Sequence, residues 1–215
     1  MIFKTLIVGP LEANCYILGD KKTNEAVCID PGGDVEEILS AIEKTGLFLK
    51  YIINTHGHFD HVGGNGQLKK AANAKLAIHK DDAILLDNVV AQGAVFGLDA
   101  AVSPQPDMRL TDKDKITIGS LTIHVIHTPG HTKGGISLFV KNPVTHQEIL
   151  FTGDTLFAGS VGRTDLPGGS YKELMASIKN KILPLGDHVK VFPGHGHETT
   201  IGKEKKFNQF LIDIK

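Results

Sequence analysis

Four side chains that can bind a metal ion are crowded into the segment THGHFDH, residues 55–61. His56 and His58 are one residue apart, and in an extended segment such residues project to the same side, so one ion could take both. Asp60 and His61 follow where the chain must turn. These two side chains can therefore face the same cavity from another direction, and they need not bind the same ion.

A solvated loop or a purification tag is the plain alternative for a histidine-rich segment. A tag lies at a terminus and repeats one residue, whereas this segment follows the apolar run Tyr51–Ile53 and precedes Gly63 and Gly64. That order predicts a buried strand, a glycine-rich turn and then a helix around residues 67–72. The context therefore favours metal binding.

Other polar side chains follow apolar runs in the same way, each beside glycine or proline. They are His131 in TPGHT, Asp154 in FTGD, His195 in FPGHG and Asp30 in IDPGG. If the strands before them lie side by side and end at one edge, these residues meet there. Asp30 has two interpretations: it orders the metal-binding loops through hydrogen bonds, or it only forms a turn.

Seven of these groups are too many for one ion, because a catalytic zinc normally takes three ligands from the protein. Two ions suit them better if one carboxylate is shared, since a carboxylate has two oxygens and an imidazole has one free nitrogen. We expect Asp154 to be shared. Two ions about 4 Å apart lower the pKa of a bound water from about 15.7 to near 7 and polarise a carbonyl, which predicts metal-assisted hydrolysis. The seven groups are His56, His58, Asp60, His61, His131, Asp154 and His195.

The remaining histidines are surplus to this ligand count. Those nearest to the motifs, His127 and His197, compete with His131 and His195, but the motifs favour the latter pair. The surplus residues are His79, His124, His127, His146, His188 and His197.

Short strands and a few helices must position these groups. Residues 34–46 and 170–183 predict helices, because apolar residues recur at helical spacing after Asp34 and Ser170 as N-caps. Residues 79–89 and 204–212 are weaker helix predictions, and residues 88–112 fit neither period and predict a long loop. Strands are predicted at residues 4–8, 14–18, 25–30, 50–54, 75–79, 121–127, 135–140, 148–153 and 189–194.

The motifs THGHFDH, TPGHT, FTGD and FPGHG, in this order, resemble those of the metallo-β-lactamase superfamily, from about residue 14 to residue 200. The resemblance implies an α/β fold, the four-layer αβ/βα sandwich. Within the superfamily the chain is similar to glyoxalase II, the hydroxyacylglutathione hydrolase. Many lactamases have a cysteine or no bridging group at the position of Asp154, so we do not expect β-lactam hydrolysis.

The similarity to glyoxalase II implies a ligand set and a reaction. One ion would be held by His56, His58 and His131, another by Asp60, His61 and His195, with Asp154 bridging and with Asp60 and Asp154 as catalytic residues. The implied reaction is hydrolysis of S-(2-hydroxyacyl)glutathione, or a related thioester, by a metal-bridging hydroxide. Zinc is the favoured metal, with iron and manganese as alternatives, because imidazole and carboxylate suit all three.

The substrate side of this resemblance is incomplete. Arg163 matches a position where the family often has a basic residue touching the thiol carrier, although pairing with Asp165 is the alternative. Full-length glyoxalase II has a C-terminal helical segment that clamps glutathione. Only 20 residues follow His195, so we expect that segment to be missing or vestigial, as in the short bacterial type.

Three other functions compete. The string GRTD, residues 162–165, is shared with persulfide dioxygenases, in which one iron would use His56, His131 and Asp154. Those enzymes usually have a cysteine two residues before the arginine, where this chain has Val161. Nucleases of the superfamily need an added basic region, and a non-catalytic binding module leaves the complete ligand set unexplained.

Composition limits the remaining choices. We expect one domain over residues 1–215, with 41% hydrophobic and 22% charged residues, and a soluble protein of the cytoplasm. The formal net charge of -1 and the lack of long charge runs argue against nucleic acid and membrane partners and favour a small-molecule substrate. Cys15 and Cys28, in apolar runs, are expected to be buried thiols. The oligomeric state is open.

Overall fold

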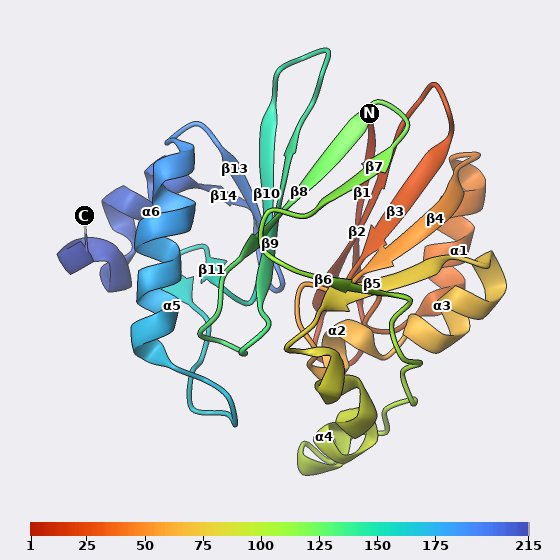
Figure 1. Cartoon of the computed structure of the whole chain (residues 1–215), viewed down its shortest axis with the longest axis horizontal. Coiled ribbons are helices and arrows are strands. Elements are labelled where there is room, and N and C mark those ends of the chain that lie inside the picture. Colours follow the sequence, from red (N-terminus) through yellow and green to blue (C-terminus); the bar gives the residue numbers. More distant parts are fainter. Residues whose placement is uncertain (215) are drawn as a thin grey trace.

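Two six-stranded β-sheets face each other at the centre of the structure (Figure 1). The computed structural model describes residues 1–214. The first sheet contains, in spatial order, β1 (Ile2–Val8), β2 (Ala13–Gly19), β3 (Glu25–Ile29), β4 (Phe48–Ile53), β5 (Lys75–His79) and β6 (Met108–Leu110). Strands β1 to β3 are antiparallel, and β3 to β6 are parallel.

The second sheet has the order β14-β13-β10-β9-β8-β7. Its strands are β7 (Lys115–Ile118), β8 (Leu121–His127), β9 (Ile136–Lys141), β10 (Glu148–Gly153), β13 (Lys190–Pro193) and β14 (Thr199–Thr200). A separate hairpin joins β11 (Leu156–Phe157) to β12 (Ser160–Val161). Strands β7, β11, β12 and β14 were not predicted from the sequence, and all four have at most four residues.

Helices cover the outer face of each sheet. Figure 1 shows α1 and α3 against the first sheet and α5 and α6 against the second. The helices are α1 (Val35–Lys44), α2 (Phe59–Val62), α3 (Asn65–Ala72), α4 (Val89–Val95), α5 (Tyr171–Ser177) and α6 (Ile201–Phe207). The four-layer αβ/βα sandwich expected from the sequence is confirmed.

Alternation along the strands separates three apolar layers. On β2, Ile17 packs toward α1 and α3, whereas its neighbour Leu18 packs into the layer between the two sheets. On β10, Leu150 packs toward α5 while Phe151 faces the first sheet. The two cysteines are buried and unpaired, as expected, with their sulfurs 3.4 Å apart.

Two predicted helices begin where expected, but with different hydrogen bonds. Ser170 accepts a hydrogen bond from the Glu173 N–H at 3.3 Å, as an N-cap does, while its own N–H donates to the Gly130 carbonyl instead of a reciprocal glutamate. Asp34 is the N-cap residue of α1, as predicted, but its carboxylate accepts from the Gly9 N–H at 2.7 Å and not from the helix, and its backbone has a φ of 48°.

The segment of residues 88–112 is only partly the loop that the sequence predicts. It contains α4 and the short strand β6, which pairs in parallel with β5. Helix α4 escaped prediction because VVAQGAV lacks a polar face, and only Val89 and Gly93 of it are buried. The weaker helix predictions are partly right: residues 83–88 form a 3-10 helix, and α6 is followed by a 3-10 helix at Gln209–Ile214.

Strand direction determines where the site forms. Strands β3, β4 and β5 are parallel, so Asp30 and the segment 55–61 leave the first sheet at the same edge. In the second sheet β8, β10 and β13 share one direction, because β9 is antiparallel to β8 and β10 and β13 is parallel to β10. His131, Asp154 and His195 follow these three strands and lie at the corresponding edge.

Among residues 1–214, no helix has both the length and the apolar composition needed to cross a membrane. The single domain expected over residues 1–215 stays a prediction.

Asp20 joins the two sheets far from this edge, and its removal tests how much that junction contributes. Its carboxylate accepts hydrogen bonds from the N–H groups of Lys22 and Thr23, at 2.6 and 3.1 Å, and from the N–H and hydroxyl of Ser120. The bonds from Ser120 hold the pKa of Asp20 well below its ordinary value. We expect Asp20→Ala to lower the free energy of unfolding by roughly 1.5–3 kcal/mol in urea titrations at pH 7.

The pH dependence of this loss has a definite sign. Because folding lowers the pKa of Asp20, the stabilisation is complete above the unfolded pKa of about 3.9 and is lost as the pH falls below it. The difference in free energy of unfolding between wild type and Asp20→Ala should therefore become smaller only at acidic pH. Asp187→Ala is the control, because the Asp187 side chain is 70% exposed. Equal losses in both variants would contradict the assignment.

Candidate metal centre

The structure brings all seven candidate ligand side chains to one edge of the two sheets. Their nitrogen and oxygen atoms form overlapping trios, each with its atoms within 4.8 Å of one another. One trio is His56, His58 and His131; a second is Asp60, His61 and His195; a third is His56, His61 and Asp154. The first two trios are the same sets that the resemblance implied.

Asp154 lies between the two trios. One of its oxygens is 3.4 Å from His61 Nε2, and the other is 3.6 Å from His131 Nε2 and 3.9 Å from His195 Nε2. The carboxylate therefore lies within 4 Å of histidines from both trios, which is the position of a shared ligand. Asp60 belongs to one side only, with an oxygen 3.2 Å from His195 Nε2 and 3.6 Å from His61 Nε2.

Hydrogen bonds orient three of the five imidazoles. His61 Nδ1 donates to Asp30 at 3.2 Å, and His131 Nδ1 donates to the Arg163 carbonyl at 2.8 Å. His56 Nδ1 lies 3.1 Å from the Thr55 hydroxyl, which itself donates to Asp30 at 2.6 Å, so His56 must donate. In each ring Nδ1 is then the donor to the surrounding protein, and Nε2 is the nitrogen directed at the centre.

Two pairs of ring nitrogens approach each other closely at this centre. His131 Nε2 is 2.9 Å from His58 Nδ1, and His61 Nε2 is 3.2 Å from His195 Nε2. A cation between such nitrogens lets both keep their lone pairs, whereas without one a proton must lie between them.

The electrostatics differ between the two sides. Burial and the neighbouring imidazole of His131 lower the pKa of His58 to about 4, and burial lowers that of His56 well below its ordinary value. Burial alone would also lower the pKa of His61, but the nearby carboxylates of Asp60, Asp154 and Asp30 raise it to about 10. One side therefore already holds the neutral imidazoles that metal binding needs, and the other carries negative charge that a cation would balance.

Two buried atoms in this centre have no hydrogen-bond partner. They are His56 Nε2 and Asp154 Oδ1, in a part of the chain that the structure describes fully. Buried polar atoms are normally paired, because leaving one unpaired costs about 1–3 kcal/mol. Orphaned nitrogen and oxygen atoms that face the same centre fit a divalent metal, so the residues present suit metal ions.

Two glycines allow the ligand loops to pack closely against one another. A Cβ on Gly194 would lie 2.1 Å from Asp154 Oδ1, and one on Gly32 would lie 1.7 Å from the Asp60 carbonyl oxygen. No side chain fits at either distance. The glycines of FPGHG and IDPGG are therefore required by the close packing of the ligand loops, which the motifs alone did not reveal.

Comparison with known proteins agrees with this geometry. The Metallo-beta-lactamase superfamily matches residues 8–195. The chain belongs to this superfamily. It is 38% identical to the "Hydroxyacylglutathione hydrolase GloC" of Haemophilus influenzae over 213 residues, covering 98% of both chains. Members of the superfamily are mostly hydrolases that bind divalent metals, and the histidine and aspartate trios suit such metals.

Solved members of the superfamily have the same fold. The B3 metallo-β-lactamase BLEG-1 is 38% identical, with a TM-score of 0.89 over 98% of this chain and 99% of that one. A protein solved "in a di-iron-bound form" is 36% identical, with a TM-score of 0.87 over 97% and 100%. ETHE1 from Myxococcus xanthus is 28% identical, with a TM-score of 0.82 over 97% and 84%.

Asp82 connects two of the loops that carry candidate ligands, and the sequence did not identify it. Its carboxylate accepts from the Gly57 N–H at 3.0 Å, between His56 and His58, and from the Thr132 hydroxyl and Gly134 N–H at 2.7 and 2.6 Å, next to His131. Nothing in HKDDAI distinguishes Asp82 from its exposed neighbour. Its role depends on contacts across 25 and 52 residues.

Asn14 and Tyr16 on β2 hold the third loop. The Asn14 amide donates to the carbonyls of Pro193 and Gly196 at 3.0 and 2.9 Å, and the Tyr16 hydroxyl donates to Pro193 at 2.6 Å. This loop carries His195. The first sheet therefore positions a ligand that belongs to the second sheet.

Arg163 makes the local ion pair that was the alternative to substrate binding. Its guanidinium donates to both oxygens of Asp165 at 2.7 Å, and about half of its side chain is exposed. Arg163 also lines the cavity over the metal centre, so a role in substrate binding stays a prediction.

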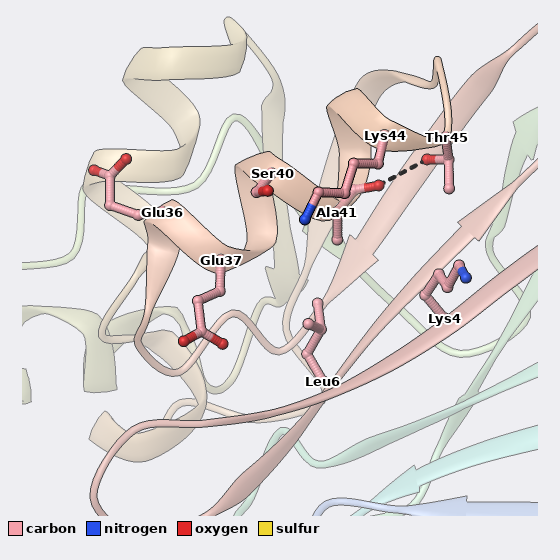
Figure 2. Close-up of a pocket in the computed structure, with 8 residues that line it drawn as sticks. All are labelled: Lys4, Leu6, Glu36, Glu37, Ser40, Ala41, Lys44 and Thr45. Atoms are coloured by element: carbon pink, nitrogen blue, oxygen red, sulfur yellow. Dashed lines mark hydrogen bonds between the residues drawn. The ribbon is translucent and has the colours of Figure 1, made fainter.

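Two of the hollows formed by residues 1–214 are considered as sites. The cavity over the metal centre has a volume of about 640 Å³ and includes His58, Asp60, His131, Asp154 and His195 in its lining. A second hollow of about 560 Å³ lies between β1 and α1, where Figure 2 shows Lys4, Glu36, Glu37 and Lys44 around it. Because its lining has no histidine or cysteine, we assign no metal chemistry to it.

One further group of ligand-type side chains lies apart from the centre. The rings of His79 and His127 are stacked, with centroids 4.1 Å apart and planes 10° from parallel, and Asp81 lies beside them. The lone pairs of imidazole lie in the ring plane, so parallel rings do not aim at a common point. That these two histidines lie outside the set of ligands stays a prediction.

Removing the Asp82 carboxylate tests whether this residue positions the loops. We expect Asp82→Ala to weaken metal binding roughly 10–100-fold, because both ligand loops lose their common anchor. Competition with a chromogenic chelator measures the change. Asp81→Ala is the matched control, since its neighbouring carboxylate is 47% exposed and anchors neither loop. Equal metal affinity in the two variants would show that Asp82 does not position the ligands.

Proposed function

We propose that this chain is a metal-dependent thioester hydrolase of the hydroxyacylglutathione hydrolase type. The observation that carries the proposal is the pair of ligand trios with Asp154 between them. The likeness to the Haemophilus influenzae GloC protein over nearly the whole length of both chains supports the choice of thioesters. The proposed substrate is S-(2-hydroxyacyl)glutathione or a related small thioester.

In this proposal the two trios hold two divalent ions, most suitably zinc, with iron and manganese as alternatives. His56, His58 and His131 would hold one ion, and Asp60, His61 and His195 the other, with Asp154 shared. Divalent ions held there would supply Lewis acidity, which lowers the pKa of water and polarises a carbonyl. A relative of known structure in a di-iron-bound form is consistent with two ions.

The chain's own groups would fix the geometry of this reaction. Asp30, Thr55 and the Arg163 carbonyl keep protons on the outer nitrogens of three imidazoles, so that the inner nitrogens stay free. Hydrolysis adds water at the thioester carbonyl and breaks the carbon–sulfur bond, giving a carboxylic acid and a thiol. The thiol has a pKa near 8.5, so it leaves as a thiolate with little help from a general acid.

Thioester hydrolysis is tested with S-lactoylglutathione. We expect purified protein loaded with zinc, iron or manganese to consume the thioester, followed by its ultraviolet absorbance and by release of free thiol. Chelator-treated protein is the control, because loss of the ions should abolish turnover. No turnover with any of the three metals would overturn the proposed substrate class.

Metal analysis tests the shared role of Asp154. We expect Asp154→Ala to hold fewer than two ions per chain after dialysis, because each ion loses the ligand that it shares with the other. Asp99→Ala, at an exposed position away from the centre, is the control. An unchanged content of two ions in Asp154→Ala, measured by elemental analysis, would rule out the bridging role.

The second candidate function is an iron-dependent persulfide dioxygenase that would use His56, His131 and Asp154. The likeness to ETHE1 is the reason to test it. Oxygen uptake dependent on glutathione persulfide, without thioester hydrolysis, would favour that enzyme. The likeness to BLEG-1 calls for a chromogenic β-lactam in the same assays, where we expect no hydrolysis. A cytoplasmic location and the absence of nucleic acid partners stay predictions.

A further inference from the structure

One wall of the cavity over the metal centre is apolar. It is formed by the segment around α4 and by one residue of the metal-binding segment, and we call it the α4 wall. Its members are Phe59, Leu85, Ala91, Val95 and Phe96. The wall begins at the ligands themselves, since Phe59 lies between His58 and Asp60 in the chain.

The α4 wall is attached directly to the metal-binding segment. The Gln92 side chain accepts from the Phe59 N–H at 3.2 Å and donates to the carbonyls of Gly57 and Leu85 at 3.3 and 3.1 Å. The rings of Phe59 and Phe96 also pack together, with centroids 5.4 Å apart. Because the wall is anchored to the ligand segment, a group lying along it has a fixed position relative to the reacting carbonyl.

Much of this wall is exposed to solvent. Val95 is 82% exposed and Phe96 is 44% exposed, although both are large apolar side chains. The chain from Asn88 to Leu98 contains no charged residue. An exposed apolar surface that continues into a metal centre is typical of a surface that a ligand covers.

Charge is placed elsewhere in the cavity. Arg163 is the one cationic side chain in its lining, among residues that the structure fully describes. Its pair with Asp165 uses two of the five guanidinium N–H donors, so the others are free for an anionic group. The α4 wall offers the carboxylates of glutathione no cation. The carrier therefore suits the side of the cavity formed by Arg163, and the α4 wall is left for the acyl arm.

We infer that the acyl arm of the substrate lies along the α4 wall and is an extended apolar chain, larger than a lactoyl group. This inference rests on the proposed thioester hydrolysis. The cavity of about 640 Å³ also takes the carrier on its Arg163 side, and the five apolar side chains of the α4 wall cover more surface than a lactoyl group and match an acyl chain of medium length. The preferred substrates are then thioesters of medium-chain acids.

A series of acylglutathiones tests the inference, from acetyl through butyryl and hexanoyl to octanoyl, with S-lactoylglutathione alongside. We expect kcat/KM of the metal-loaded protein to rise by up to about fourfold for each CH₂ that the wall covers. A flat response to chain length, with every thioester still hydrolysed, would overturn this inference and leave the proposed function standing. No turnover of any member would instead contradict the proposed function.

Variants of the wall show whether it causes the rise. Val95→Asp should flatten the response to chain length, and Ala91→Phe should shift the preference toward short acyl groups by filling the wall. Both positions are exposed, so neither change disturbs the core. Val144→Asp, in the turn after β9 and 78% exposed, is the matched control and should keep the wild-type response. A full rise in Val95→Asp would contradict the inference.

A binding measurement separates the wall from catalysis. Butanol, hexanol and octanol are titrated into the protein while the methyl resonances of Ala91 and Val95 are followed by NMR. We expect these resonances to shift with an affinity that increases by about fourfold for each added CH₂. If octanol shifts neither resonance, the inference about the α4 wall is wrong. This outcome does not depend on whether the protein hydrolyses thioesters. In a matched series, the acyl group is kept constant and the alkyl chain of the thiol carrier is lengthened. A rise of kcat/KM with the length of the thiol carrier would also overturn the inference.

Discussion

The main constraint on this structure is that many nitrogen and oxygen atoms with lone pairs lie close together at one edge of the two sheets. Five imidazoles and two carboxylates converge there, with nitrogens as close as 2.9 Å and with two buried atoms unpartnered. Without a cation this arrangement costs free energy through repulsion and desolvation. Hydrogen bonds accepted by the Asp30 and Asp82 carboxylates, one of them donated by the Thr55 hydroxyl, hold it in place, so the fold is organised around binding positive charge.

The anchors of the ligand loops are shared between the two halves of the fold. Asp82 follows a strand of the first sheet but bonds to the loop that carries His131. Asn14 and Tyr16 likewise reach from β2 to the loop that carries His195. The loops that carry His131 and His195 are therefore not held by their own sheet alone, and the packing of the two sheets determines the positions of these ligands.

Much of this could be predicted from the sequence, because the ligands occupy contiguous motifs at strand ends. Strand periodicity located the segment 55–61, His131, Asp154 and His195, and parallel strand direction explains why they meet. Asp82 and Gln92 could not be found this way, since their contacts join segments distant in sequence and their local patterns are ordinary. Helix α4 was missed for a related reason: its apolar side chains face a cavity, so they lack the stripe that core packing imposes.

The bond from the Asn14 amide to the Pro193 carbonyl spans 179 residues. Contacts of such sequence separation form late during folding, because chain entropy opposes them until both sheets have docked. The loop bearing His195 consequently acquires its final position only when the first and last strands are together. During synthesis on a ribosome, the candidate ligands would therefore come together only after nearly all of the chain has emerged.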